Sequence, residues 1–271
     1  GRVLSSGMDV RPLAGTLGAE LLGVSVAELD DRVVTSLREA VLEHQVVALP
    51  GQDLDDGQHR ALTEALGGVR PPVEYLPTNA AAGHPDIAVL DSVGGIRADI
   101  WHTDVSWSQT PPALSVLRSL IVPPAGGDTM WASQYAAYDA LSPAMQEFLG
   151  GLTAYHTGQN LPLEGGTIQG GREAFEAVHP VIRTHPETGR KALYVNETFT
   201  RRINELTPGE SDALLAHLWA HAVRPEFTCR WRWSPGDVVI WDNRCVQHYG
   251  VFDYDEHRLM HRTEVVGDRP Q

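Results

Sequence analysis

Trp101-His102-Thr103-Asp104 is the stretch of this 271-residue sequence that most constrains its fold. In an extended strand, residues i and i+2 project from the same face roughly 6.5 Å apart, whereas in a helix they point in different directions. His102 and Asp104 can therefore act together only on an extended segment. An imidazole and a carboxylate side by side are two of the three ligands of a facial 2-His-1-carboxylate site, which binds iron(II) and leaves coordination positions open.

A third ligand for such a site is His248, which ends the run Trp241–His248 and lies 144 residues after Asp104. Ten residues further begins Arg258-Leu259-Met260-His261-Arg262. On a strand, Arg258 and Arg262 share a face about 13 Å apart, whereas His261 points to the opposite side. Two guanidiniums inside a barrel are costly to bury unless anions meet them. The pattern therefore implies two anions near the metal.

Short apolar runs separated by turn residues predict a chain built mainly from β-strands. We expect strands at Gln45–Leu49, Ile87–Leu90, Ala113–Leu120, Val181–Thr184, Ala192–Val195, Thr228–Trp233, Val238–Trp241 and Leu259–Val266. Helices are expected at Asp31–His44 and Asp55–Leu66, and from Ser142-Pro143 and Thr207-Pro208 onward. Many short strands with a few peripheral helices indicate a jelly-roll barrel flanked by helices.

The length of the chain favours one domain over residues 1–271. Within it, Gly158–Gly171 contains five glycines and few large apolar residues. Such a segment buries too little apolar surface to be rigid by itself. A variable surface loop is one interpretation, and a lid that orders over the metal when substrate arrives is the other.

Composition limits the partners of this protein. The net charge of −14 argues against a general nucleic-acid or anionic-membrane surface, so local arginines must attract a small anionic organic substrate. The sequence shows no long apolar run and no leader, and Cys229 and Cys245 are its only cysteines. These features favour a cytoplasmic protein. A homo-oligomer is also expected, although no motif specifies one.

Taken together, His102-Thr103-Asp104, His248 and Arg258–Arg262 resemble the taurine dioxygenase family of iron(II)- and 2-oxoglutarate-dependent oxygenases. The resemblance extends from about Val10 to Asp268 and is densest in Trp101–Pro112, Gly126–Thr129, Tyr194–Glu197 and Phe227–Arg262. It implies a mainly β fold, the double-stranded β-helix or cupin-like jelly roll. It also implies Fe(II) as cofactor, with 2-oxoglutarate and O2 as cosubstrates.

The resemblance assigns roles to further residues. Arg258 matches the family arginine that anchors the distal carboxylate of 2-oxoglutarate, and Thr129 matches a threonine that adds a hydroxyl to the same carboxylate. Arg262 matches the arginine that binds the substrate's sulfonate. Phe199 lies where the family has an aromatic wall near the substrate, although ordinary core packing explains it equally well. No catalytic residue is implied beyond the three metal ligands.

Two departures from the family pattern concern the substrate. Pro71 and Ala98 pair with a histidine and an asparagine that the family uses for an amino-sulfonate, and neither side chain can donate a hydrogen bond. We therefore expect an organic sulfonate or sulfate ester rather than taurine. The expected reaction hydroxylates the carbon next to the sulfur group and releases sulfite or sulfate with an aldehyde, succinate and CO2, which is a role in sulfur metabolism.

Two other functions remain open. The first is an oxygenase of the same fold that hydroxylates a carboxylate substrate without releasing an inorganic anion. The second is a non-catalytic metal-binding jelly roll, such as a zinc-binding barrel. Zinc prefers closed four-ligand sites, or three protein ligands with water, and does not require inward arginines. Arg258 and Thr129 therefore favour the oxygenase.

Overall fold

The computed structural model describes residues 2–3, 7–71, 79–94, 97–159 and 175–271. The helices in these ranges are α1 (Asp31–His44), α2 (Asp56–Gly67), α3 (Gln134–Asp139), α4 (Pro143–Leu149), α5 (Pro208–Ala222) and the short 3-10 helix η2 (Pro225–Phe227). The strands are β1 (Arg2–Val3), β2 (Asp9–Pro12), β3 (Ala19–Leu22), β4 (Val46–Leu49), β5 (Asn79–Ala81), β6 (His84–Asp91), β7 (Leu114–Ile121), β8 (Thr129–Ser133), β9 (Thr153–Thr157), β10 (Glu176–Pro180), β11 (Ile182–Thr184), β12 (Lys191–Leu193), β13 (Thr200–Ile203), β14 (Thr228–Trp231), β15 (Val238–Asp242), β16 (Val246–Gly250) and β17 (Leu259–Glu264).

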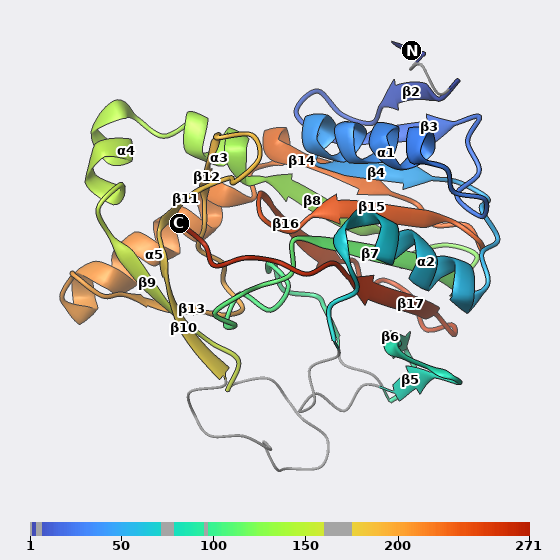
Figure 1. Cartoon of the computed structure of the whole chain (residues 1–271). Helices are drawn as coiled ribbons and strands as arrows, with labels where there is room; N and C mark the ends of the chain where they lie inside the picture. Colours follow the sequence, from blue (N-terminus) through green and yellow to red (C-terminus); the bar gives the residue numbers. More distant parts are fainter. Residues whose placement is uncertain (1, 4–6, 72–78, 95–96, 160–174) are drawn as a thin grey trace.

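Two facing sheets form the centre of the molecule (Figure 1). The larger sheet has the strand order β1-β2-β3-β4-β15-β7-β17-β6-β5, and the smaller has the order β14-β8-β16. Their inner faces share one buried apolar cluster, the interior cluster, whose large members are Trp131, Trp233, Trp241, Tyr135 and Met260. Mainly β structure with helices outside the sheets confirms the predicted jelly-roll fold class.

Strand β4 shows why a central strand can be apolar throughout. Val46 and Ala48 belong to the interior cluster, whereas Val47 and Leu49 pack on the other face of the sheet against helices α1 and α2. Successive side chains on a strand alternate between faces, so β4, which meets an apolar cluster on each face, has an apolar side chain at every position. The whole of β4 is buried accordingly.

Helices α1 and α2 begin where their capping residues predict. The carboxylate of Asp30 accepts a hydrogen bond from the N–H of Val33 at the start of α1, and α1 spans the predicted Asp31–His44. Asp55 and Gln58 form a capping box at α2, so Asp55 is the N-cap rather than the first helical residue. Such caps satisfy N–H groups that have no partner inside the helix.

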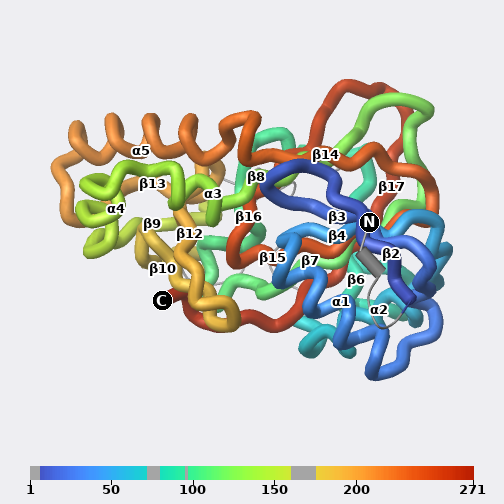
Figure 2. Tube along the Cα trace, turned by 90° about the horizontal axis from the view of Figure 1, so that it is seen from above, coloured from blue at the N-terminus to red at the C-terminus, as the bar shows by residue number. Residues whose placement is uncertain are grey.

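A second lobe lies at the other end of the sheets, where α3, α4 and α5 pack with β9–β13 (Figures 1 and 2). Ser142 and Thr207 cap α4 and α5, as predicted. The strands expected at Val181–Thr184 and Ala192–Val195 pair as the hairpin β11–β12, with Gly189 at a φ of 69° in its turn. The lobe supplies its own apolar cluster around Leu193, Leu215 and Leu218.

Several short strands were not predicted from the sequence. Strands β2, β3, β8, β9, β10 and β16 lack a clear apolar run, because their partners, rather than their own patterns, determine them. Most of the predicted lid, residues 160–171, lies outside the described residues. Gly158 lies inside them, and a Cβ there would come within 2.9 Å of the Trp107 ring. Within the described chain, no helix is long and apolar enough to cross a membrane.

Candidate metal centre

His102 and His248 are neighbours across an isolated antiparallel bridge. The N–H of His102 donates to the carbonyl of His248 at 3.1 Å, and the N–H of His248 donates to the carbonyl of His102 at 2.8 Å. Directly opposed residues of an antiparallel pair project from the same face. The two imidazoles accordingly face each other, with ring centroids 4.0 Å apart.

Asp104 completes a compact group of three buried ligand residues. Its Oδ1 lies 3.6 Å from Nε2 of His102 and 3.5 Å from Nε2 of His248. All three ligand atoms lie within 4.8 Å of one another, and no other such group of three or more occurs in the described part of the chain. The structure therefore brings together the three residues that the sequence predicted as metal ligands.

The local backbone differs from the prediction. His102 pairs with His248, but Asp104 already begins a turn rather than continuing a strand. The next residue, Val105, has a φ of 54°. This left-handed conformation is unfavourable for a β-branched side chain, and residues held in it occur preferentially at functional sites. The strained turn lets Asp104 approach both histidines without a continuous strand.

The protonation states suit metal binding. Nδ1 of His102 lies 2.8 Å from the carbonyl of Ile100, so Nδ1 carries the proton and Nε2 presents a lone pair to the site. Burial lowers the pKa of His248 to about 3, so this imidazole is neutral. Burial also disfavours the Asp104 carboxylate, but His248 and Arg262 outweigh that effect and its pKa is lowered. Two imidazoles and one carboxylate are the ligand set of an iron(II) site.

Hydrogen bonds orient Asp104 from two sides. The hydroxyl of Ser115 donates to Oδ2 of Asp104 at 2.9 Å. Asn243 accepts from the N–H of Asp104 at 2.9 Å through Oδ1, and its Nδ2 donates to the carbonyls of Asp104 and Pro112 at 2.9 and 3.1 Å. Contacts of this kind fix the direction in which a ligand points. Asn243 thus acts as a clamp on the backbone of Asp104.

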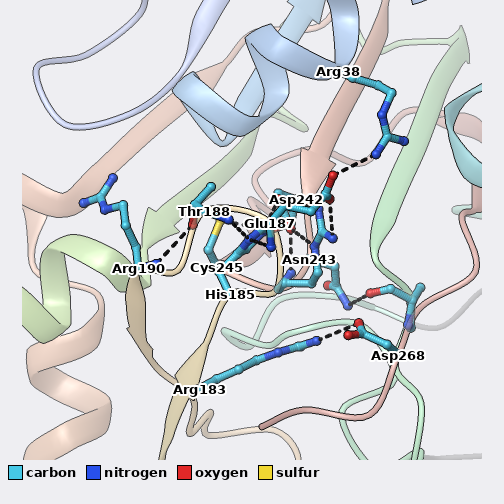
Figure 3. Close-up of polar contacts among 12 residues, drawn as sticks. Arg38, Arg183, His185, Glu187, Thr188, Arg190, Asp242, Asn243, Cys245 and Asp268 are labelled. Carbon is cyan, nitrogen blue, oxygen red and sulfur yellow. Dashed lines mark hydrogen bonds and ion pairs between the residues drawn. The ribbon is translucent and has the colours of Figure 1, made fainter. Parts of the chain in front are cut away.

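A buried ionic network holds the turn that carries Asn243 and leads to His248 (Figure 3). Asp242 accepts from Nε and Nη2 of Arg244 at 2.8 and 3.0 Å and lies 2.8 Å from Nε2 of His185. Arg244 also pairs with Glu187 at 2.7 Å, and Glu187 pairs with Arg38 of α1 at 2.9 Å. The network connects the turn to the β11–β12 hairpin and to α1. The sequence analysis missed it, because Arg38, His185 and Glu187 are remote from the turn in sequence.

Arg258 lies beside the turn that leads into β8. Its Nε donates to the carbonyl of Gly127 at 3.2 Å. Gly127 has a φ of 74°, and a Cβ there would lie 3.1 Å from Cδ of Arg258, so only glycine fits. Burial lowers the pKa of Arg258, and Tyr254 and Asp128 oppose this only in part. Asp128 is itself paired with Arg230 at 2.7 Å, and Arg258 forms no ion pair with a carboxylate among the described residues.

Thr129 lies on the same side of the smaller sheet as His248. In the pairing of β8 with β16, Trp131 is opposite His248 and Thr129 is opposite Gly250. Residues two apart on a strand share a face. The buried hydroxyl of Thr129 accepts a hydrogen bond from Nε1 of Trp233 at 2.9 Å. Its own proton is thus available to another acceptor.

Arg262 corrects one step of the sequence argument. Its Nη1 lies 3.2 Å from Oδ1 of Asp104, and its Nη2 lies 3.4 Å from Oε1 of Glu264. The protein itself therefore supplies counter-ions for Arg262, and burial of this arginine alone does not require an external anion. His261 points to the other side of β17, as predicted, where its Nδ1 lies 2.9 Å from Asp56 of α2.

Arg70 is a charged residue of this region that the sequence analysis missed. Pro71 and Ala98, the residues paired with the family's polar positions, are exposed. Arg70, immediately before Pro71, places Nη1 3.2 Å from Oε2 of Glu264. The sequence could have indicated that Glu264 lies near Arg262, because residues two apart on a strand share a face.

Phe199 lies against one of the ligand histidines of the metal site. Its ring meets that of His102 edge to face, with centroids 6.1 Å apart. Phe199 is buried in a small apolar cluster with Val105, Trp107 and Phe175. The cluster places an apolar wall next to one of the ligand histidines.

Comparison with known proteins agrees with this geometry. The family model described as taurine catabolism dioxygenase TauD, TfdA family matches residues 9–263. The chain is 38% identical to an alkylsulfatase of Acinetobacter baylyi, covering 96% of this chain and 86% of the relative. It is 36% identical to an alpha-ketoglutarate-dependent sulfate ester dioxygenase of Pseudomonas putida, covering 97% and 91%. A solved structure of a taurine dioxygenase from Burkholderia xenovorans is 37% identical, with a TM-score of 0.85 and coverage of 97% and 92%.

Proposed function

This chain belongs to the TauD, TfdA family and is a 2-oxoglutarate-dependent dioxygenase, and we propose that its substrates are organic sulfate esters. The observation that carries the proposal is the convergence of His102, Asp104 and His248 beside Arg262, in a chain similar over nearly its whole length to two enzymes named for sulfate esters. Organic sulfonates are the second substrate class of the proposal.

We propose that His102, Asp104 and His248 hold the iron(II) that the family implies. The fit rests on the two imidazoles, the oriented carboxylate and the close approach of their ligand atoms. Bound iron would supply the activation of O2, with 2-oxoglutarate as the electron donor. The contribution of the chain is to orient the ligands through Ser115 and Asn243 and to surround the site with apolar side chains.

Arg258 and Thr129 are proposed to bind the distal carboxylate of 2-oxoglutarate. A guanidinium offers two parallel N–H donors that match a carboxylate. The absence of a dedicated carboxylate partner for Arg258 within the described residues supports this assignment, because a half-buried guanidinium is stabilised by an incoming anion. The free proton of the Thr129 hydroxyl offers a further donor.

The substrate's anionic group is proposed to meet Arg262, and Phe199 to form part of the wall for its apolar chain. Hydroxylation of the carbon that bears a sulfate group inserts one oxygen atom into a C–H bond. The product has a hydroxyl and a sulfate on one carbon, so the C–O bond to sulfate breaks while the hydroxyl loses its proton. An aldehyde and hydrogen sulfate leave. For a sulfonate the C–S bond breaks and the products are an aldehyde and hydrogen sulfite.

A substrate screen tests the proposal. The protein is supplied with iron(II), 2-oxoglutarate and O2 and is given an alkyl sulfate, an alkyl sulfonate, taurine or an alkyl carboxylate of matched length. Succinate and released sulfate or sulfite are measured, with Asp104→Ala as the inactive control. We expect succinate and sulfate in equal amounts from the alkyl sulfate. Turnover of the carboxylate alone would instead establish the same-fold alternative, with no inorganic anion released.

Two properties inferred from the sequence stay predictions. The homo-oligomer is tested by light scattering on the purified protein. The cytoplasmic location is tested by fractionating the cells that produce the protein.

A further inference from the structure

Four buried or half-buried charged groups of alternating sign lie in a row that includes Arg262, the residue proposed to bind the substrate's anionic head group. Asp104 contacts Arg262 at 3.2 Å, Arg262 contacts Glu264 at 3.4 Å, and Glu264 contacts Arg70 at 3.2 Å. The side chains of Arg262, Glu264 and Arg70 are 18%, 13% and 15% exposed. The carboxylate of Glu264 is thus largely shielded from water. Charge interactions in such a place are stronger than in water.

The row leaves Arg262 with little uncompensated charge. Both of its terminal nitrogens face carboxylates, while its Nε is buried without a hydrogen-bond partner among the described residues. The carboxylate of Asp104, which contacts Arg262, has a separate role as a proposed metal ligand. Glu264 has no such role, although it adds a negative charge beside the residue proposed to receive the substrate's anion.

Stability does not account for the Glu264–Arg70 pair. A buried ion pair is often no more stable than an apolar pair of the same volume. The main chain already brings the two segments together, because the N–H of Arg70 donates to the carbonyl of Glu264 at 2.8 Å and Val69 bridges Val265. We therefore expect the carboxylate of Glu264 to influence which anions bind at the site, since specificity often depends on repulsion of the wrong ligand.

We propose that Glu264, held by Arg70, makes the head-group site selective for singly charged anions over doubly charged ones, and so for sulfate esters over phosphate esters. The inference rests on the proposed function in one respect, namely that Arg262 receives the head group. Sulfate and phosphate esters are both tetrahedral and similar in size, so shape separates them poorly. At neutral pH a phosphate ester carries about −1.5 to −2 charges, whereas a sulfate ester carries one.

The inference is tested by equilibrium binding without turnover. Hexyl sulfate and hexyl phosphate are titrated calorimetrically, without oxygen and at about pH 7.5 where the phosphate is mainly dianionic, into protein loaded with iron(II) and 2-oxoglutarate. The wild type is compared with Glu264→Gln, Arg70→Gln and the double variant. Glu147→Gln, on the exposed surface of α4, is the matched control, because it changes the net charge equally but far from the site.

Glu264→Gln is expected to lower the ratio of sulfate affinity to phosphate affinity by about tenfold or more, since one charge at contact distance outweighs thermal energy even with strong screening. Arg70→Gln is expected to weaken the binding of both anions and to raise the ratio of sulfate affinity to phosphate affinity. The double variant restores the local charge and is expected to return the ratio to that of the wild type. The comparison of the double variant with Arg70→Gln also tests the effect of Glu264 if Glu264→Gln alone is poorly folded.

The outcomes separate this inference from the function on which it rests. If the wild type binds hexyl sulfate but the ratio is the same in all variants, Glu264 does not discriminate and only the inference falls. A ratio that shifts equally in Glu147→Gln would assign the effect to overall charge and would also overturn it. Failure of the wild type to bind hexyl sulfate at all would remove the proposed function, and the inference with it.

Discussion

Replacing Asn243 by alanine removes three hydrogen bonds that fix the backbone around Asp104. The side chain is fully buried, and its amide contacts the N–H and the carbonyl of Asp104 and the carbonyl of Pro112 at 2.9, 2.9 and 3.1 Å. Alanine offers no substitute for any of them. The substitution therefore acts on the main chain of Asp104, while the three ligand residues themselves are not replaced.

The expected magnitude follows from these contacts. Three buried hydrogen bonds at about 1 kcal/mol each give a loss of about 3 kcal/mol in the free energy of unfolding. The freed N–H of Asp104 is left in a turn that already contains Val105 at a φ of 54°, so the turn is expected to relax and to move the carboxylate. Loss of a residue that orients a metal ligand typically lowers metal affinity by about 10- to 100-fold.

The assay has two parts. Urea denaturation of the metal-free protein measures stability, and anaerobic calorimetry with iron(II) measures metal affinity. Ser211→Ala is the control, because it removes a buried hydrogen bond to the N–H of Ile203 in the α5 lobe and is expected to lower stability without changing metal affinity. A variant Asn243→Ala with wild-type metal affinity would refute the clamp, whatever its stability.

Three further predictions concern the same protein. Asp104→Ala is expected to abolish both turnover and tight iron(II) binding, which calorimetry and succinate release measure together. Arg258→Ala is expected to weaken 2-oxoglutarate by several kcal/mol because a buried carboxylate loses its charged partner, and an unchanged apparent affinity for 2-oxoglutarate would contradict the assignment. Burial lowers the pKa of His59 to about 3, below the unfolded value of 6.5, so its contribution to stability is present above pH 6.5 and is lost as the pH falls toward 3. At pH 5 the loss is about 2 kcal/mol, and a pH series of urea denaturations that is no shallower for His59→Gln than for the wild type would exclude this cause.

Local patterns in the sequence predicted the elements that have a strong signal of their own. Helix α1 coincides with the predicted Asp31–His44, because an aspartate cap and an apolar stripe are both local features. The central strands β4, β7 and β15 were predicted within one or two residues, because large apolar residues, typical of buried strands, make up most of each one. Short strands such as β2 and β16 were missed, since pairing with a neighbour stabilises them.

The site divides in the same way. The spacing of His102 and Asp104 predicted that these two side chains lie together, because both are carried by one short segment. His248 was identified by chemistry and by the family resemblance rather than by spacing. The bridge that joins it to His102 is a contact between remote segments, which no local period reveals.

By itself, the sequence determined the kinds of ligand, the central strands and the opposite directions in which His261 and Arg262 point from β17, since these follow from residue chemistry and a period of two. Only the tertiary structure decided that Arg262 faces Asp104 and Glu264 and that Arg70, separated from Glu264 by 194 positions, closes the row. The physical reason is register. The antiparallel pairing of remote segments determines which charges meet, and the summed field of those charges, rather than any one arginine, determines which anion the site accepts.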